Sequence, residues 1–334
     1  MKIVLRIAKV VGMALAAALV LVILFLTVGR TKAMQPEWGV NFSEKLIGDL
    51  GLSPREVYAA ILDDLGAKRV KLATYWDILE PTDNNFDFNN LDEQFAQAEK
   101  HNAEIILVVG MKTPRWPECH LPEWAKNLNQ SQQQEQILEY LRAVVSRYKG
   151  SPALYMWQVE NEPLFDFGEC PWLDISFLRK EVALVKEIDS AHPVLISDTG
   201  EYSFWIQAAR IGDVVGTTLY RKVWFKQAQM YFAYFLPAIS YKRRADLIRT
   251  LFGKEVIDVE LQAEPWGPRL YYDLSLEEQA KTMNLEQFRK NVDFARHTGL
   301  KQHYFWGAEW WYWLKVKHND PSFWDEAKKI FAGS

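Results

Sequence analysis

Cysteine is scarce in this chain of 334 residues, which contains only Cys119 and Cys170. Neither cysteine lies in a C-x-x-C pair or in a Cys/His spacing typical of zinc sites, and the six histidines form no ligand set. A structural zinc ion needs four such ligands. The sequence therefore predicts neither a metal site nor a cofactor.

Long runs of like charge are also missing. The net charge is only −4, and no block of lysine and arginine is long enough to follow a phosphate backbone, so nucleic acid is not an expected partner. No G-x-G-x-x-G or G-x-x-x-x-G-K-[ST] motif follows an early apolar run, which removes the usual nucleotide chemistry of a doubly wound sheet. No Pro/Gly/Ser-rich linker or internal repeat divides the chain, so one domain is the simplest organisation.

Aromatic residues, in contrast, are abundant. They make up 14% of the chain and include 14 tryptophans. Aromatic rings stack on the apolar faces of sugars, but they also fill protein cores. The composition fits a carbohydrate site and a tryptophan-rich core equally well.

The first segment of the chain is different in kind from the rest. Residues 10–28 carry no charge, and their length as a helix nearly spans the hydrocarbon core of a membrane. Three basic residues precede this run, and the only site resembling a signal-peptidase sequence is Thr31-Lys32-Ala33. We therefore expect a cytoplasmic tip and single-pass signal-anchor over residues 1–33, with an extracytoplasmic domain over 34–334; a cleaved signal peptide and secretion are the alternative.

Eight short β-rich runs alternate with amphipathic helical patterns after the anchor. This alternation, over about 300 residues, predicts a (β/α)8 TIM barrel of parallel strands. The helical patterns include residues 91–100 and 132–148. The expected strands are 38–42, 69–73, 104–109, 154–160, 193–197, 214–218, 256–260 and 303–306.

Two glutamates stand at ends of these expected strands. Glu162 follows the fourth strand in Asn161-Glu162-Pro163, and Glu260 ends the seventh. The active site of a TIM barrel lies at the carboxyl ends of its strands, so these carboxyl groups are expected to face one another across the barrel. A pair about 5–5.5 Å apart is the arrangement of a retaining glycosidase.

At these positions the chain resembles the retaining glycoside hydrolases of clan A, especially the cellulase-like family 5 and the related β-galactosidase and β-xylosidase families. Those enzymes carry Asn-Glu after the fourth strand and a nucleophilic Glu at the end of the seventh, which match Asn161, Glu162 and Glu260. The resemblance extends over nearly the whole region after the anchor. Further similar segments are 75–81, 86–88, 113–116, Tyr220 and 305–307.

The resemblance implies a retaining β-glycosidase in which Glu162 is the general acid/base and Glu260 the nucleophile. Burial and the charge of Glu260 are expected to raise the pKa of Glu162. By the same resemblance Asn161 would hold the sugar 2-hydroxyl, Tyr220 would hydrogen-bond the nucleophile, and Trp306 would form the floor of the site. A transglycosylase with the same carboxylates and a non-catalytic carbohydrate-binding barrel remain alternatives.

Several further residues have less certain roles at this stage. The family pattern has an arginine on the second strand where this chain has Lys71, which makes no bidentate contact. Lys71, Trp76 and Trp266 are candidate substrate contacts. Glu264 competes with Glu260 as nucleophile, but four extended residues carry it roughly 13 Å farther along the chain, so we expect it at the rim with Trp266.

Two more features follow from the expected barrel. Cys119 and Cys170 lie in the loops after the third and fourth strands, which emerge side by side, so a disulfide is expected if the domain faces an oxidising compartment. The aromatic segment 224–241 is expected to be core under a long loop, with a substrate wall or a membrane-interfacial patch as the alternatives.

Overall fold

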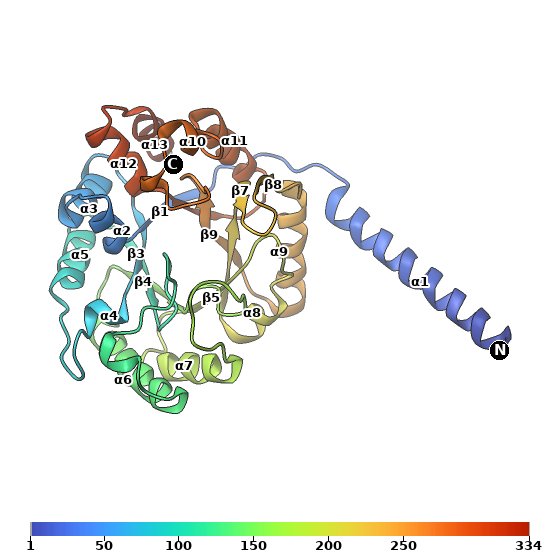
Figure 1. Ribbon diagram of the computed structural model, residues 1–334, viewed down its shortest axis with the longest axis horizontal. Coiled ribbons are helices and arrows are strands. Elements are labelled where there is room, and N and C mark those ends of the chain that lie inside the picture. Colours follow the sequence, from blue (N-terminus) through green and yellow to red (C-terminus); the bar gives the residue numbers. More distant parts are fainter. Residues whose placement is uncertain (1, 334) are drawn as a thin grey trace.

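The computed structural model describes residues 2–333 and contains a closed barrel of eight parallel strands. The order around the barrel is β1, β10, β9, β6, β5, β4, β3, β2, and helices surround it (Figure 1). The barrel strands are β1 (Glu37–Phe42), β2 (Arg69–Ala73), β3 (Glu104–Val109), β4 (Leu154–Val159), β5 (Val194–Asp198), β6 (Val214–Leu219), β9 (Val256–Gln262) and β10 (Gln302–Trp306).

The predicted (β/α)8 barrel is thereby confirmed, and each expected strand is present to within two residues. The largest difference is at β9, which extends two residues past Glu260 because Leu261 and Gln262 still pair with Phe305 and Trp306 of β10. Glu260 therefore lies inside a strand, with its backbone fixed on both sides.

Helices α2 to α13 connect the strands. Their local signals are clear in α6, where Asn129 and Gln132 form a capping box, and Ile137, Leu141 and Val144 form a buried stripe with helical spacing. The helices that follow the first one, Lys2–Thr27, are α2 (Glu44–Asp49), α3 (Pro54–Asp63), α4 (Trp76–Leu79), α5 (Asn89–Lys100), α6 (Gln130–Tyr148), α7 (Ile175–Ile188), α8 (Ile206–Ile211), α9 (Ala238–Phe252), α10 (Leu276–Ala280), α11 (Leu285–Arg296), α12 (Ala308–Lys317) and α13 (Ser322–Ala332), with short 3-10 turns at Glu123–Ala125 and Tyr271–Asp273.

The core has two parts. A large cluster fills the space between the strands and the helices, and a smaller apolar cluster that includes Ile106, Met156 and Val259 is separate from it. Asp258 and His303, both fully buried, add a polar contact between β9 and β10, with Oδ2 and Nδ1 2.7 Å apart. The other ring nitrogen of His303 lies 3.2 Å from the hydroxyl of Thr298, just after α11, so this pair lies on the helix side of the strands.

The N-terminal helix α1 (Lys2–Thr27) projects away from the barrel (Figure 1). Its apolar part, Lys9–Thr27, is long enough to cross a membrane and is not buried in the protein. Such a helix near the N-terminus fits a signal-anchor and a signal sequence alike. Met1 and Ser334, the outer ends of the expected segments 1–33 and 34–334, lie outside the described residues.

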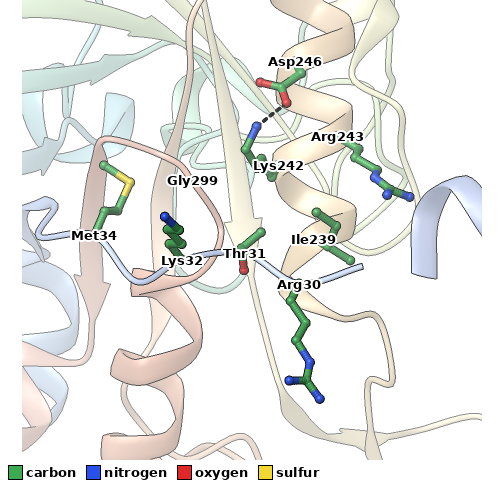
Figure 2. A pocket seen from close by; sticks show the side chains of 9 residues that line it. All are labelled: Arg30, Thr31, Lys32, Met34, Ile239, Lys242, Arg243, Asp246 and Gly299. Atoms are coloured by element: carbon green, nitrogen blue, oxygen red, sulfur yellow. Dashed lines mark hydrogen bonds and ion pairs between the residues drawn. The ribbon is translucent and has the colours of Figure 1, made fainter. Parts of the chain in front are cut away.

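A basic cavity of about 490 Å3 lies where the chain passes from α1 to the barrel. Figure 2 shows Arg30 and Lys32 from the connecting segment and Lys242 and Arg243 from α9 among its lining residues. Arg243 also contacts the end of α1, with its guanidinium carbon 5.1 Å from the centre of the Phe25 ring. The end of α1 is thereby held against the first half of α9.

The expectation of core burial for segment 224–241 is wrong for most of its aromatic residues. The segment forms a two-stranded hairpin of β7 (Lys222–Phe225) and β8 (Met230–Ala233) outside the barrel, followed by α9. Phe225, Phe232 and Phe235 are exposed, the last to 80%. The number of aromatic residues in a segment does not show whether they are buried. Here the barrel strands pair with one another without the hairpin, so the hairpin stays outside the barrel.

Candidate active site

Glu162 and Glu260 are both connected to β6. The backbone of Thr218 pairs with Glu260 across the sheet, and the Thr218 hydroxyl donates a 3.1 Å hydrogen bond to Oε1 of Glu162. One residue of β6 therefore positions a group from β9 and a group from the loop after β4 at the same end of the barrel.

Two donors hold the Glu260 carboxylate, one at each of its oxygens. The ammonium of Lys71 on β2 lies 3.0 Å from Oε1, and the hydroxyl of Tyr220 lies 2.9 Å from Oε2. The side chains of Lys71 and Glu260 are only 1% and 4% exposed, so the ammonium supplies the charge that a buried carboxylate requires. In this chain the residue beside the carboxylate is therefore Lys71 and not the arginine of the family pattern.

The backbone around Glu162 is held in an uncommon conformation. Its φ of 40° lies in the left-handed region, at a cost of order 1–3 kcal/mol for such a residue. Three hydrogen bonds fix this turn: the Glu162 N–H donates to Ser197 Oγ at 2.8 Å, and its carbonyl accepts from Lys112 Nζ at 3.0 Å and from the N–H of Phe165 at 3.0 Å. The surrounding loops therefore determine where the Glu162 carboxyl group points.

Electrostatics at this position favour a protonated acid. Burial raises the pKa of Glu162 well above its usual range, and the charges of Glu260 and then Glu118 raise it further. The neighbouring Lys112 acts in the opposite direction with a smaller effect. A carboxyl group that retains its proton near neutral pH is what a general acid requires.

A third carboxyl group, Glu118, was not expected from the sequence. It comes from the long loop after β3, is buried, and accepts a 3.0 Å hydrogen bond from Nδ2 of Asn161. Burial, with a contribution from Glu260, raises the pKa of Glu118 to about 8. Because a side-chain amide nitrogen carries two N–H groups, the bond to Glu118 uses only one of those of Asn161.

Trp306 lies beneath an arginine from the loop after β3. The guanidinium carbon of Arg115 is 4.0 Å from the centre of the indole ring, and Arg115 also pairs with the buried carboxyl groups of Glu264 and Glu309. Glu264 is only 6% exposed, so its expected position at the rim is wrong. Glu264 forms its ion pair with Arg115, whereas Lys71 and Tyr220 hold the two oxygens of Glu260.

The two remaining tryptophan candidates differ. Trp266 is partly exposed, and its ring lies edge-on to Tyr220 with centroids 5.0 Å apart, so it borders the site. Trp76 is fully buried, donates a 2.7 Å hydrogen bond to Glu80, and packs against Trp124 and Tyr140. The expectation that Trp76 contacts substrate is therefore wrong, because α4 turns its ring into the core.

The loops around the site are joined covalently and carry aromatic rings. A disulfide connects Cys119, next to Glu118, with Cys170 in the loop after β4, and their Cα atoms are 5.1 Å apart. On the same loops Trp116 is 51% exposed and its ring lies near that of Phe167. Within residues 2–333 we find no group of three or more His, Cys, Asp or Glu side chains arranged to hold a metal ion.

Comparison with known proteins gives a consistent picture. A family model described as Glycosyl hydrolase family 10 matches residues 59–181, a segment that contains Asn161 and Glu162. Beta-galactosidase BgaA of Clostridium cellulovorans is 27% identical over 173 residues, which cover 45% of this chain and 26% of that protein. Mannan endo-1,4-beta-mannosidase A of Aspergillus aculeatus is 38% identical over 65 residues, covering 18% of this chain and 16% of that protein.

Solved structures agree on the fold. Xylanase 10B of Thermotoga petrophila RKU-1 superposes with a TM-score of 0.54 at 16% identity, covering 82% of each chain. The chain spans about a quarter or less of the length of the two curated relatives named above. The resemblance to glycoside hydrolases that the strand-end motifs predict is confirmed by these matches.

Proposed function

We propose that this chain, which belongs among the retaining glycoside hydrolases of clan A, is a β-glycosidase that uses Glu162 as acid/base and Glu260 as nucleophile. The observation that carries the proposal is the different environment of the two carboxyl groups. Glu260 is paired with the ammonium of Lys71 and the hydroxyl of Tyr220, whereas the pKa of Glu162 is raised by burial and by Glu260 itself. Two carboxyl groups in such opposed environments suit the two roles of double displacement.

The reaction would proceed in two steps. In the first, a Glu260 oxygen attacks the anomeric carbon while Glu162 gives its proton to the leaving oxygen, which produces a covalent glycosyl-enzyme. Esterification removes the charge of Glu260, so the pKa of Glu162 falls and Glu162 acts as base for the incoming water. The two inversions return the original β configuration.

The polar groups around the pair would bind the sugar. The second amide N–H of Asn161 is suited to a hydroxyl next to the anomeric carbon, and the Trp306 ring to the face of the sugar. Glu118, protonated near neutral pH, is a further candidate for a sugar hydroxyl because a carboxylic acid both donates and accepts. The relatives named above act, by their names, on galactosides, mannan and xylan, so these define the first substrates to try.

We also propose that the catalytic domain lies outside the cytoplasm and is held by α1. The disulfide between Cys119 and Cys170 supports an oxidising compartment, and the exposed apolar span supports a membrane. The carbohydrate substrate would then be extracytoplasmic.

The test is hydrolysis of 4-nitrophenyl β-galactoside, β-mannoside, β-xyloside and β-glucoside, and of the corresponding oligosaccharides, by the full-length protein. Glu162→Gln and Glu260→Gln should each lower kcat by several orders of magnitude, whereas Glu264→Gln should retain more activity. Product analysis by NMR distinguishes retention from inversion and free sugar from transfer to an acceptor. A protein that binds these sugars without turning any over would be a non-catalytic barrel.

A further inference from the structure

An apolar pocket of about 280 Å3 lies beside the candidate site. This volume is just below the range of about 300–1,000 Å3 for pockets that enclose a whole drug-sized ligand, so it suits part of a molecule. Its walls come from the loop after β5, from the exposed hairpin and from the chain between β8 and α9. The lining residues are Glu201, Tyr202, Phe225, Phe232, Tyr234, Phe235 and Leu236.

Residues of the pocket contact neighbours of both proposed catalytic carboxyl groups. Glu201 accepts a 2.9 Å hydrogen bond from the N–H of Tyr220, the residue whose hydroxyl holds Glu260. The ring of Tyr202 stacks near Phe165, which follows Glu162 in the loop after β4, with centroids 6.2 Å apart. Glu162 gives its proton to the leaving group, so a pocket next to it is placed to receive the aglycone.

The pocket offers little to a second sugar. The hydroxyls of Tyr202 and Tyr234 are 2.7 Å apart and hydrogen-bond each other, which uses one donor and one acceptor of the pair. Oε1 of Glu201 already accepts from the Tyr220 N–H and from the Tyr241 hydroxyl at 3.1 Å. Sugar hydroxyls placed against the rings of Phe225, Phe232 and Phe235 would lose their hydrogen bonds to water without replacement, whereas an apolar chain gains by burial.

The hairpin also lies on the side of the barrel that faces the N-terminal helix. The chain runs directly from β8 through Phe235 into α9, and α9 is the helix that carries Arg243 against Phe25 of α1 (Figure 1). Next to this contact lies the basic cavity of Figure 2, whose lysine and arginine side chains would attract anionic headgroups if α1 crosses a membrane. The hairpin and the chain after it, which carry Phe232 and Phe235, therefore lie on the side of the barrel where α1 ends.

We infer that the substrate is an amphiphilic β-glycoside, a sugar headgroup on an apolar aglycone, and that the first part of that aglycone occupies the pocket. The inference rests on the proposed function and specifies its substrate class. The sugar is transferred to Glu260 as the glycosidic bond breaks, and the Glu162 proton leaves on the aglycone oxygen, so the lipid departs as an alcohol. Water then releases the free sugar and returns a proton to Glu162.

The experiment compares methyl and n-octyl β-glycosides of one accepted sugar, with the full-length protein in phosphatidylcholine vesicles. The two alcohols are chemically similar leaving groups, so a difference in kcat/KM reports binding of the chain. Burial of one methylene corresponds to roughly fourfold in kcat/KM, so even two or three buried methylenes predict a preference for octyl of at least tenfold. Phe232→Ser combined with Phe235→Ser should reduce this octyl-to-methyl ratio about tenfold.

Leu251→Ser is the matched control, because Leu251 is 60% exposed on α9 and does not line the pocket. It should keep the wild-type ratio. An octyl preference that the double variant retains would mean partition of the substrate into vesicles, not binding in the pocket, and would overturn the inference, as would equal rates for both glycosides. Failure of the wild type to hydrolyse any β-glycoside, the 4-nitrophenyl panel included, would instead reject the proposed function.

Discussion

Replacing Glu118 with glutamine tests whether the site contains a third carboxyl group that remains protonated. Glutamine is nearly isosteric, and its amide oxygen can still accept the 3.0 Å hydrogen bond from Asn161. The variant therefore removes the titrating proton and leaves the shape of the loop after β3 almost unchanged. Any difference in stability between wild type and variant that changes with pH then comes from the Glu118 carboxyl group.

The magnitude follows from the raised pKa of this group, about 8 against an ordinary value of 4.5. Between these two values the folded protein holds a proton that the unfolded chain has released, so the contribution of Glu118 to stability is greatest below pH 4.5 and falls as pH rises towards 8. The loss is about 1.4 kcal/mol per pH unit. From pH 5 to pH 8 it amounts to about 4 kcal/mol, which Glu118→Gln should not show.

Urea unfolding of wild type and Glu118→Gln, followed by tryptophan fluorescence at pH 5, 6.5 and 8, measures this difference. Other buried carboxyl groups titrate in both proteins, so the comparison isolates Glu118. The variant should gain stability relative to wild type as pH rises. A stability difference of the same size at pH 5 and pH 8 would refute the raised pKa and with it the role of Glu118 as a neutral donor.

Three other features are testable by direct measurements. Lys71→Met should lower the free energy of unfolding by about 3–5 kcal/mol, because it leaves the Glu260 charge buried without its partner. Lys71→Arg keeps the positive charge and should lose less stability. A methionine variant as stable as wild type would contradict the pairing. Cys119→Ser with Cys170→Ser should cost roughly 4 kcal/mol for the 51-residue separation, and labelling of the unreduced, unfolded wild type should find no free thiols. Full-length protein should stay with membranes through carbonate washing, and a soluble form beginning near Met34 would show cleavage instead.

The barrel was predictable because its signals are local. Most strands are short runs rich in apolar residues, and polar residues follow several of them, as at Asn161 and Glu162. Helix periodicity supplied the elements between them. These patterns depend on neighbours a few residues away, so the sequence alone locates the strands and the proposed pair of carboxyl groups.

The contacts contributed by loops were not predictable in the same way. Glu118 has a φ of 74° in a loop without periodicity, and nothing near it in sequence indicates that it meets Asn161. Two other expectations were wrong. Trp76 follows a strand end, where a substrate contact was expected, but it is buried in the core. The aromatic segment of the hairpin was expected to be core, but most of its rings are not buried. Which face of a ring is covered depends on elements that are distant in sequence.

The central claim is that Glu260 forms a covalent bond to the sugar, and trapping of the glycosyl-enzyme tests it most directly. A 2-deoxy-2-fluoro β-glycoside with an activated leaving group, made from a sugar that the enzyme accepts, should inactivate the protein and increase its mass by one fluoroglycosyl group. Peptide mapping by mass spectrometry should then locate the label on Glu260. A label on Glu264, or slow turnover of an accepted sugar with inversion and no label, would contradict the account.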